Sequence, residues 1–178
     1  MFALTKVRQM SKALGFLTSL VLVGLPVVVV WSLFASLADP YSMANHFPGL
    51  PESTVFTPQK TALAGAVGSL MLIPSLFVLW QMRRLFSRYL QGEVLTALCA
   101  GHIRKIGLGF VVLAGAGILL PTVQSLILTH DNPTGQRVLS VAITSDSLGF
   151  LLAGGLLTVI GWAMTEAARA AEENAGFI

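Results

Sequence analysis

Four long apolar stretches, separated by polar segments, dominate the pattern of this chain. They run over about residues 15–37, 61–82, 106–128 and 147–168. Crossing about 30 Å of hydrocarbon at about 1.5 Å per residue takes roughly 20 helical residues, and each stretch reaches that length. Because unpaired backbone amides are costly in hydrocarbon, the stretches should be helices and not an open sheet. We therefore predict an all-α, polytopic membrane protein, with residues 1–178 forming one four-transmembrane-helix bundle.

The composition points the same way. Hydrophobic residues make up 54% of the chain and charged residues only 11%, whereas a soluble domain is about 25% charged. So few charges cannot cover a surface that faces water. The single Cys99 excludes a disulfide within the chain.

Basic residues predict the orientation in the membrane, because segments rich in Lys and Arg stay in the cytoplasm. Nine of the eleven basic residues fall at the two ends or in segment 83–105. They are Lys6, Arg8, Lys12, Arg83, Arg84, Arg88, Arg104, Lys105 and Arg169. The other two, Lys60 and Arg137, fall in segments 38–60 and 129–146. We expect both termini and loop 83–105 to be cytoplasmic, and the other two segments to be outer loops.

The first apolar stretch also has features of a secretory signal. Basic residues precede it, and Ser36-Leu37-Ala38 resembles a small-residue cleavage site. The apolar core of a signal is only about 7–15 residues, and this one is longer. We therefore favour a retained helix over a cleaved signal, and N-terminal sequencing of the mature protein distinguishes the two.

The two outer loops contain apolar positions and turn residues. In the first loop, four prolines prevent a long helix, and its apolar residues either rest on the bilayer interface, which we favour, or bind an extracellular ligand. These residues are Phe47, Leu50, Val55 and Phe56. In the second loop, imperfect alternation over 137–144 predicts a short strand or an interfacial segment. The string Thr144-Ser145-Asp146 should cap the fourth helix.

The segment between the second and third stretches is the most informative loop. Its apolar residues recur at helical spacing up to Leu90, so the second helix should continue past the membrane and break near Gly92. The loop can lie on anionic lipid, pack under the bundle or bind a cytosolic partner, and its sequence alone favours the first two. Together with the C-terminal tail it forms a candidate surface for a protein partner or for lipid. This surface comprises Arg83, Arg84, Arg88, Arg104, Lys105, Glu172 and Glu173.

Small residues at four-residue spacing mark candidate packing faces within the spans, since small-xxx-small patterns let membrane helices approach closely. The candidates are Gly65, Ser69, Gly149, Ala153, Gly154 and Gly161. We favour packing inside one bundle, and a dimer seam is the alternative. Gln124 should hydrogen-bond between helices, while Pro26, Pro74 and Pro121 should kink their spans.

Residues able to carry chemistry are scarce. The chain has no nucleotide-binding glycine loop, paired Cys-x-x-Cys, His-Glu-x-x-His or nucleophile elbow, so we predict no enzyme, no cofactor and no catalytic residue. A metal site on the outer side would have to combine residues from separate loops whose spacing matches no known site, and we do not expect one. Its ligands would be His46, Asp39, His130, Asp131 and Asp146.

The loop and tail resemble the bacterial domain of unknown function 2975 family. The stretches RLFSRYLQGEVLT and HIRKIGLGF carry the resemblance, and the tail ARAAEENAGFI is similar to that family's ending. The matching residues are Leu85, Phe86, Gln91, Gly92, Leu95, Thr96, Arg104, Ile106, Gly107, Glu172, Glu173, Asn174 and Ile178. The chain departs from the pattern at 97–99 and at 175–177. The resemblance implies four spans, and a regulatory or immunity role beside small helix-turn-helix regulators.

Three functions remain at this point. The first is a non-enzymatic protein of the bacterial inner membrane that acts through protein contacts, without direct nucleic-acid binding. The second is a subunit of an oligomeric small transporter or channel, because four spans are few for a monomeric carrier. An intramembrane enzyme ranks last, since no convergent acid, base or metal residues are present.

Overall fold

The computed structural model describes residues 2–47, 49–51, 53–94, 96–133 and 135–175. These residues form α-helices, one 3-10 helix and connecting segments, with no strand among them. The elements are α1 (Phe2–Ala38), η1 (Pro40–His46), α2 (Pro58–Ser69), α3 (Leu72–Leu90), α4 (Ala97–Thr129) and α5 (Ser145–Ala175). The all-α prediction is confirmed.

Four helical segments are long and apolar enough to cross a membrane. They are Arg8–Ala38, Pro58–Leu90, Ala97–Thr129 and Ser145–Ala171. Many of their large apolar side chains are exposed, including Phe16, Trp31 and Trp162. Such a surface is stable in lipid and not in water, so the prediction of a multi-pass membrane protein with four crossings is confirmed.

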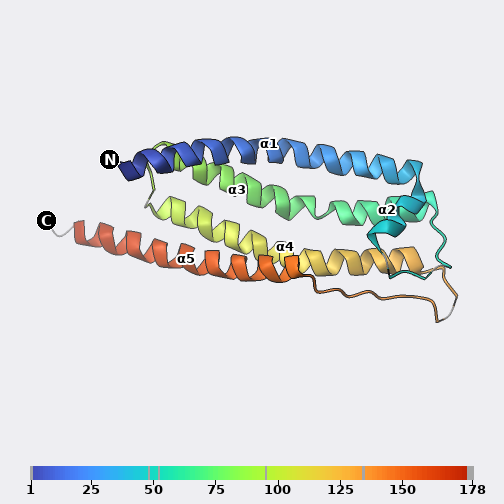
Figure 1. Cartoon of the computed structure of the whole chain (residues 1–178). Helices are drawn as coiled ribbons and strands as arrows, with labels where there is room; N and C mark the ends of the chain where they lie inside the picture. The colour runs from blue at the N-terminus through green and yellow to red at the C-terminus, as the bar shows by residue number, and fades with distance from the viewer. Residues whose placement is uncertain (1, 48, 52, 95, 134, 176–178) are drawn as a thin grey trace.

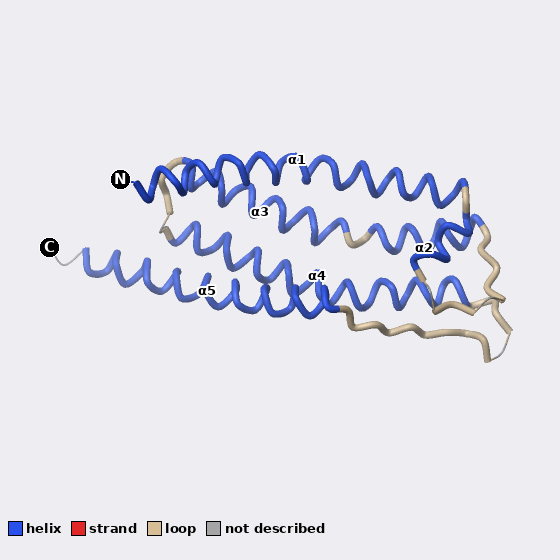
Figure 2. Tube along the Cα trace, in the orientation of Figure 1, coloured by secondary structure: helices blue, strands red, loops and turns tan. Residues whose placement is uncertain are grey.

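The four helical segments of the predicted bundle form an open row in chain order (Figures 1 and 2). α1 lies beside α2 and α3, these lie beside α4, and α5 packs on α4. In the described residues α5 makes no comparable contact with α1. Lipid explains how the row can remain open, since hydrocarbon tails solvate apolar helix faces as well as other helices do.

Both described ends of the chain lie at one end of the row, which we call the terminal end (Figure 1). The turn between α3 and α4 is also there. The opposite end, here the loop end, holds η1 and the connections to α2 and from α4.

The second crossing is a broken helix. α2 ends at Ser69 and α3 begins at Leu72, with a turn over Leu70 and Met71. Pro74 explains the break, because it has no N–H to donate to the carbonyl of Leu70, which accepts instead from Ile73 N at 3.1 Å. The prediction that Pro74 disturbs its span is confirmed.

Capping residues set the other helix ends. Gly92 follows α3 with a φ of 86°, a left-handed conformation that glycine adopts readily, so the predicted break near this residue is confirmed. Thr96 Oγ1 then accepts a hydrogen bond from Cys99 N at 3.3 Å at the start of α4. Thr144 Oγ1 accepts from Ser147 N at 3.2 Å at the start of α5, which confirms the predicted cap.

The connection between α4 and α5 is not a simple loop outside the spans. A Cβ added to Gly117 would lie 3.1 Å from Ser147 Oγ, so α5 begins beside the middle of α4. Residues 136–144 run back along the last turns of α4 without regular secondary structure (Figure 2). The predicted short strand does not form there.

Two α4 hydroxyls hold this returning segment. Val138 N donates to Thr129 Oγ1 at 3.2 Å, and Ser140 N donates to Ser125 Oγ at 3.2 Å. Both acceptor side chains are fully buried. Non-helical backbone packed against an apolar helix needs such partners, because neither lipid nor a dry protein surface supplies them.

Candidate functional sites at the two ends

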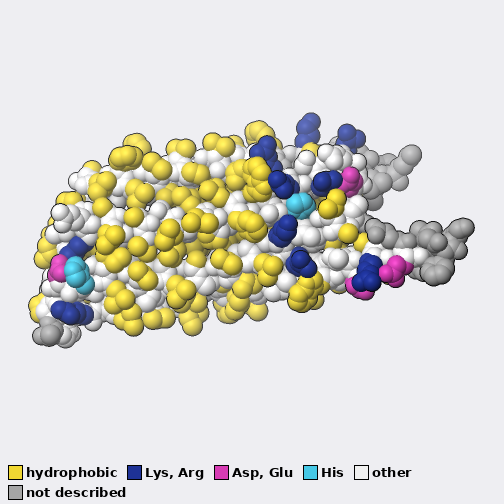
Figure 3. Space-filling model, turned by 180° about the vertical axis from the view of Figure 1, so that it is seen from behind, with side chains coloured by type: hydrophobic (Ala, Val, Ile, Leu, Met, Phe, Trp, Pro, Cys, Tyr) yellow, Lys and Arg dark blue, Asp and Glu magenta, His cyan; other side chains and the backbone are white. Residues whose placement is uncertain are grey.

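The predicted basic surface lies at the terminal end, where dark blue side chains gather beside the apolar spans in Figure 3. Arg83, Arg84, Arg104 and Lys105 are exposed. The Arg84 guanidinium lies 5.2 Å from the centre of the Trp80 ring, a distance at which cation–π attraction acts. α3 and α4 thus contribute two cations each to one surface.

Most cations of this surface have no acidic partner. Arg88 pairs with Glu93 at 2.9 Å, and Arg169 of α5 pairs with Glu173 at 3.0 Å. Among the described residues, the four exposed cations on α3 and α4 form no ion pair. The side chain of Glu172 lies outside the described part of the chain. The surface therefore presents uncompensated positive charge.

A polar contact beneath this surface joins α3 to α4. His102 Nδ1 lies 2.7 Å from Oε1 of Gln81, whose side chain is buried. An interhelical hydrogen bond with one buried partner resists sliding of one helix along the other. The bond thereby holds the basic residues of α3 and α4 in a fixed position relative to each other. Sequence reasoning missed this pair, since neither residue indicates its partner.

Glycines bring α4 and α5 into backbone contact next to the basic surface. A Cβ added to Gly154 would lie 2.7 Å from Gly107 O, and one added to Gly161 would lie 2.7 Å from Arg104 N. Real Cβ atoms do not approach so closely, so only glycine fits at these two positions. Gly154 and Gly161, two of the candidate packing residues, therefore pack α5 against α4 of the same chain.

The other candidate packing residues have different surroundings. A Cβ on Gly65 would lie 2.7 Å from Leu33 Cδ2, so Gly65 packs α2 against α1. Gly149 and Ala153 are exposed on α5, and a Cβ on Gly149 would meet nothing within 4 Å. Ser69 lines a cavity.

This cavity, of about 640 Å³, lies at the loop end between α1, η1, α2 and α4. We call it the loop-end cavity. Its apolar wall includes Trp31, Leu33, Met43, Phe47 and Pro121. Its volume falls within the range of about 300–1,000 Å³ that is typical of ligand pockets. No pattern along the chain predicted this cavity, because its walls come from four elements far apart in the sequence.

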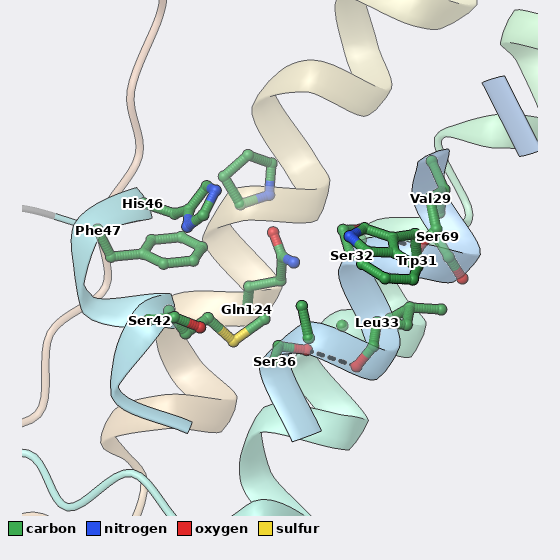
Figure 4. A pocket seen from close by; sticks show the side chains of 15 residues that line it. Val29, Trp31, Ser32, Leu33, Ser36, Ser42, His46, Phe47, Ser69 and Gln124 are labelled. Atoms are coloured by element: carbon green, nitrogen blue, oxygen red, sulfur yellow. Dashed lines mark hydrogen bonds between the residues drawn. The ribbon is translucent and has the colours of Figure 1, made fainter. Parts of the chain in front are cut away.

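Gln124 is the central polar group of the loop-end cavity (Figure 4). Its Nε2 donates to Ala64 O at 2.9 Å, so the interhelical hydrogen bond predicted for Gln124 is confirmed. A Cβ added to Gly68 would overlap the Gln124 amide, and the missing side chain is therefore what admits the amide between α2 and α4.

A charged cluster marks the loop end itself. Lys60 Nζ lies 2.9 Å from Asp131 Oδ2, and His130 Nε2 is close to the other carboxylate oxygen. The hydrogen bond from Lys60 is the main cause that lowers the pKa of Asp131 below its ordinary value. In the described residues no group of three or more His, Cys, Asp or Glu side chains could hold a metal ion.

Three of the four apolar residues singled out in the connection 38–60 pack against other side chains or line a cavity. The rings of Tyr41 and Phe56 lie 5.6 Å apart, and Phe47 and Leu50 line a second cavity of about 360 Å³ next to the returning segment. Val55 is exposed. His46 and Phe47 line both cavities, so the end of η1 lies between them.

Comparison with known proteins adds no relative. No family model, curated protein sequence or solved structure matches the chain. The resemblance noted in the loop and tail stays a prediction.

Proposed function

We propose that this protein is an integral component of a bacterial inner membrane, with both termini in the cytoplasm, and that it acts through protein contacts without catalysing a reaction. A regulatory or immunity-type role fits this description. The proposal rests on four cations at the terminal end that form no ion pair with any described residue. They are Arg83, Arg84, Arg104 and Lys105.

The charges at the terminal end support both the proposed membrane orientation and the proposed contact with a protein partner. The cations lie beside apolar spans, where the positive-inside rule favours the cytoplasm and where each can attract anionic lipid with about 1 kcal/mol. The last turns of α5 carry Glu166, Arg169 and Glu173, all exposed. Charges of both signs on a helix suit a protein surface better than a uniformly anionic bilayer.

The orientation is tested with a reporter enzyme fused after Ile178. Activity confined to the cytoplasmic side is expected, and activity confined to the outer side contradicts the proposal. A second fusion within the connection 129–146 should give the opposite result.

The protein contact is tested by co-purification from native membranes. We expect a partner to be recovered with the natural chain and to be lost with Arg83→Gln/Arg84→Gln/Glu173→Gln. Arg137→Gln, which removes an exposed cation at the loop end, serves as the matched control and should retain the partner. Recovery of no partner with the natural chain contradicts the proposal.

A second candidate is a subunit of an oligomeric transporter or channel. The open row favours it, because α5 leaves Gly149 and Ala153 uncovered, and small residues on a lipid-facing helix permit close approach of another chain. A single, monomeric species in mild detergent contradicts it. If oligomers form, Gly149→Leu should dissociate them.

A further inference from the structure

We propose that the loop-end cavity binds one neutral amphiphile, with an alkyl chain in its apolar part and a hydroxyl head group that donates a hydrogen bond to Gln124. This inference is independent of the function proposed above, which concerns the terminal end. It rests on the position of the cavity, on its supply of hydrogen-bond acceptors and on its lack of charge.

The cavity lies at membrane depth and reaches the surface of the row. Gln124 precedes Asp131 by seven residues, which is about 10 Å along a helix, so it lies well inside the boundary marked by the Lys60–Asp131 pair. Trp31, in the wall formed by α1, is 75% exposed. An amphiphile dissolved in the bilayer can therefore enter from the side without crossing water.

Hydrogen-bond acceptors outnumber donors in the lining. The hydroxyls of Ser36, Ser42 and Ser69 each donate to a carbonyl of their own helical segment, at 2.9, 2.7 and 2.7 Å. Figure 4 shows the Ser36 bond to Leu33. With their hydrogens used in this way, these side chains offer only lone pairs to a ligand.

Gln124 supplies the strongest of these acceptors. Its Nε2 donates to Ala64 O, and within the described chain its Oε1 forms no hydrogen bond. Since no fully buried side-chain oxygen of the described residues lacks a partner, this Oε1 is accessible from the cavity. A hydroxyl group that enters the cavity can donate to it, while the bond to Ala64 O holds the amide in place.

The head group is expected to be neutral. Among the described residues that line the cavity there is no Asp, Glu, Lys or Arg, and His46 is the single titratable side chain. A charged head group would lose its hydration without gaining a counter-ion, which is unfavourable at this depth. The apolar wall formed by Leu33, Met43 and Phe47 matches an alkyl chain.

The experiment uses the full-length chain in phosphatidylcholine nanodiscs and a 16-carbon alcohol with a photoreactive diazirine in the chain. We expect saturable labelling that maps by mass spectrometry to the segments around residues 29–36 and 42–47. Unlabelled hexadecanol should compete about fivefold better than its methyl ether, because the ether lacks the donor and one net hydrogen bond is lost.

Two variants test the site itself. Gln124→Met keeps the side-chain length, removes the acceptor and should lower labelling about fivefold, as loss of one hydrogen bond predicts. Ser42→Leu narrows the cavity from η1 without touching the Gln124–Ala64 bond, and it should also lower labelling. This variant keeps the test decisive if Gln124→Met fails to fold. Gln59→Met, an exposed amide outside the cavity, should leave labelling unchanged.

Three results would overturn the proposal. The first is labelling that does not saturate, which indicates general contact with the bilayer. The second is equal competition by alcohol and ether, which indicates an ordinary acyl-chain groove without head-group recognition. The third is full labelling of Ser42→Leu.

Discussion

The two halves of α4 pack in opposite ways. In the terminal half, Gly107 meets the backbone of α5 at Gly154, and no space remains between the helices. In the loop-end half, Ser125 and Thr129 contact an extended segment, and Gln124 faces a cavity. Two regular helices that meet at glycines leave no space for a ligand. A helix that packs against non-helical backbone must supply side-chain hydrogen-bond partners for that backbone, and space remains beside them.

The largest expected effect comes from filling the glycine contact. Gly154→Val places side-chain atoms on the Gly107 carbonyl and forces the helices apart, and overpacking of this kind costs about 1–3 kcal/mol. Gly155→Val makes the same change at the next residue, where a Cβ meets nothing within 4 Å. Thermal unfolding in detergent should therefore show a clearly lower Tm for Gly154→Val than for Gly155→Val. Equal values for the two would refute the tight contact.

A smaller effect is expected in the loop-end half. Ser125→Ala combined with Thr129→Val removes the acceptors of Val138 N and Ser140 N, at about 1 kcal/mol for each hydrogen bond. Hydrogen exchange at these two amides should become faster, while exchange in the α4–α5 contact stays unchanged. Thr122→Val, which removes a hydroxyl bonded only within α4, is the control and should leave both amides protected.

The smallest effect concerns the charged cluster at the loop end. Because the pKa of Asp131 is lowered in the folded chain, its contribution to stability is present above the ordinary value of 3.8 and is lost as the pH falls through the lowered value. Asp131→Asn should remove this acid-dependent part of the Tm, and Asp146→Asn, which lacks a basic partner among the described residues, should not. An unchanged acid dependence in Asp131→Asn would contradict the role of the Lys60–Asp131 pair.

Much of the fold followed from physics that is local in the sequence. Lipid requires helices wherever about 20 apolar residues occur in a row, and Pro74 interrupts the second crossing. Gly92 ends α3 through its left-handed backbone conformation, and Thr144 begins α5 through its side-chain cap. Each of these features depends on a few neighbouring residues. That is why the pattern along the chain could predict them.

Features that join distant segments could not be predicted in the same way. The spacing of Gly154 and Gly161 indicated a packing face, but the sequence did not identify Gly107 as the residue that Gly154 contacts. The returning segment 136–144 was expected in an outer loop, because its alternation does not reveal the Ser125 and Thr129 hydroxyls that receive it. The loop-end cavity depends on four elements and on the absence of a side chain at Gly68, which no linear pattern expresses.

The returning segment has a consequence for how the protein is made. The helix α5 begins at Ser145, beside the middle of α4, so the returning segment depends on the α4 hydroxyls as acceptors for Val138 N and Ser140 N. Because α4 is synthesised before this segment, both acceptors are present when it emerges. We therefore expect residues 136–144 to reach their final path only once α4 is in place, so that α4 and α5 form one hairpin in a single step.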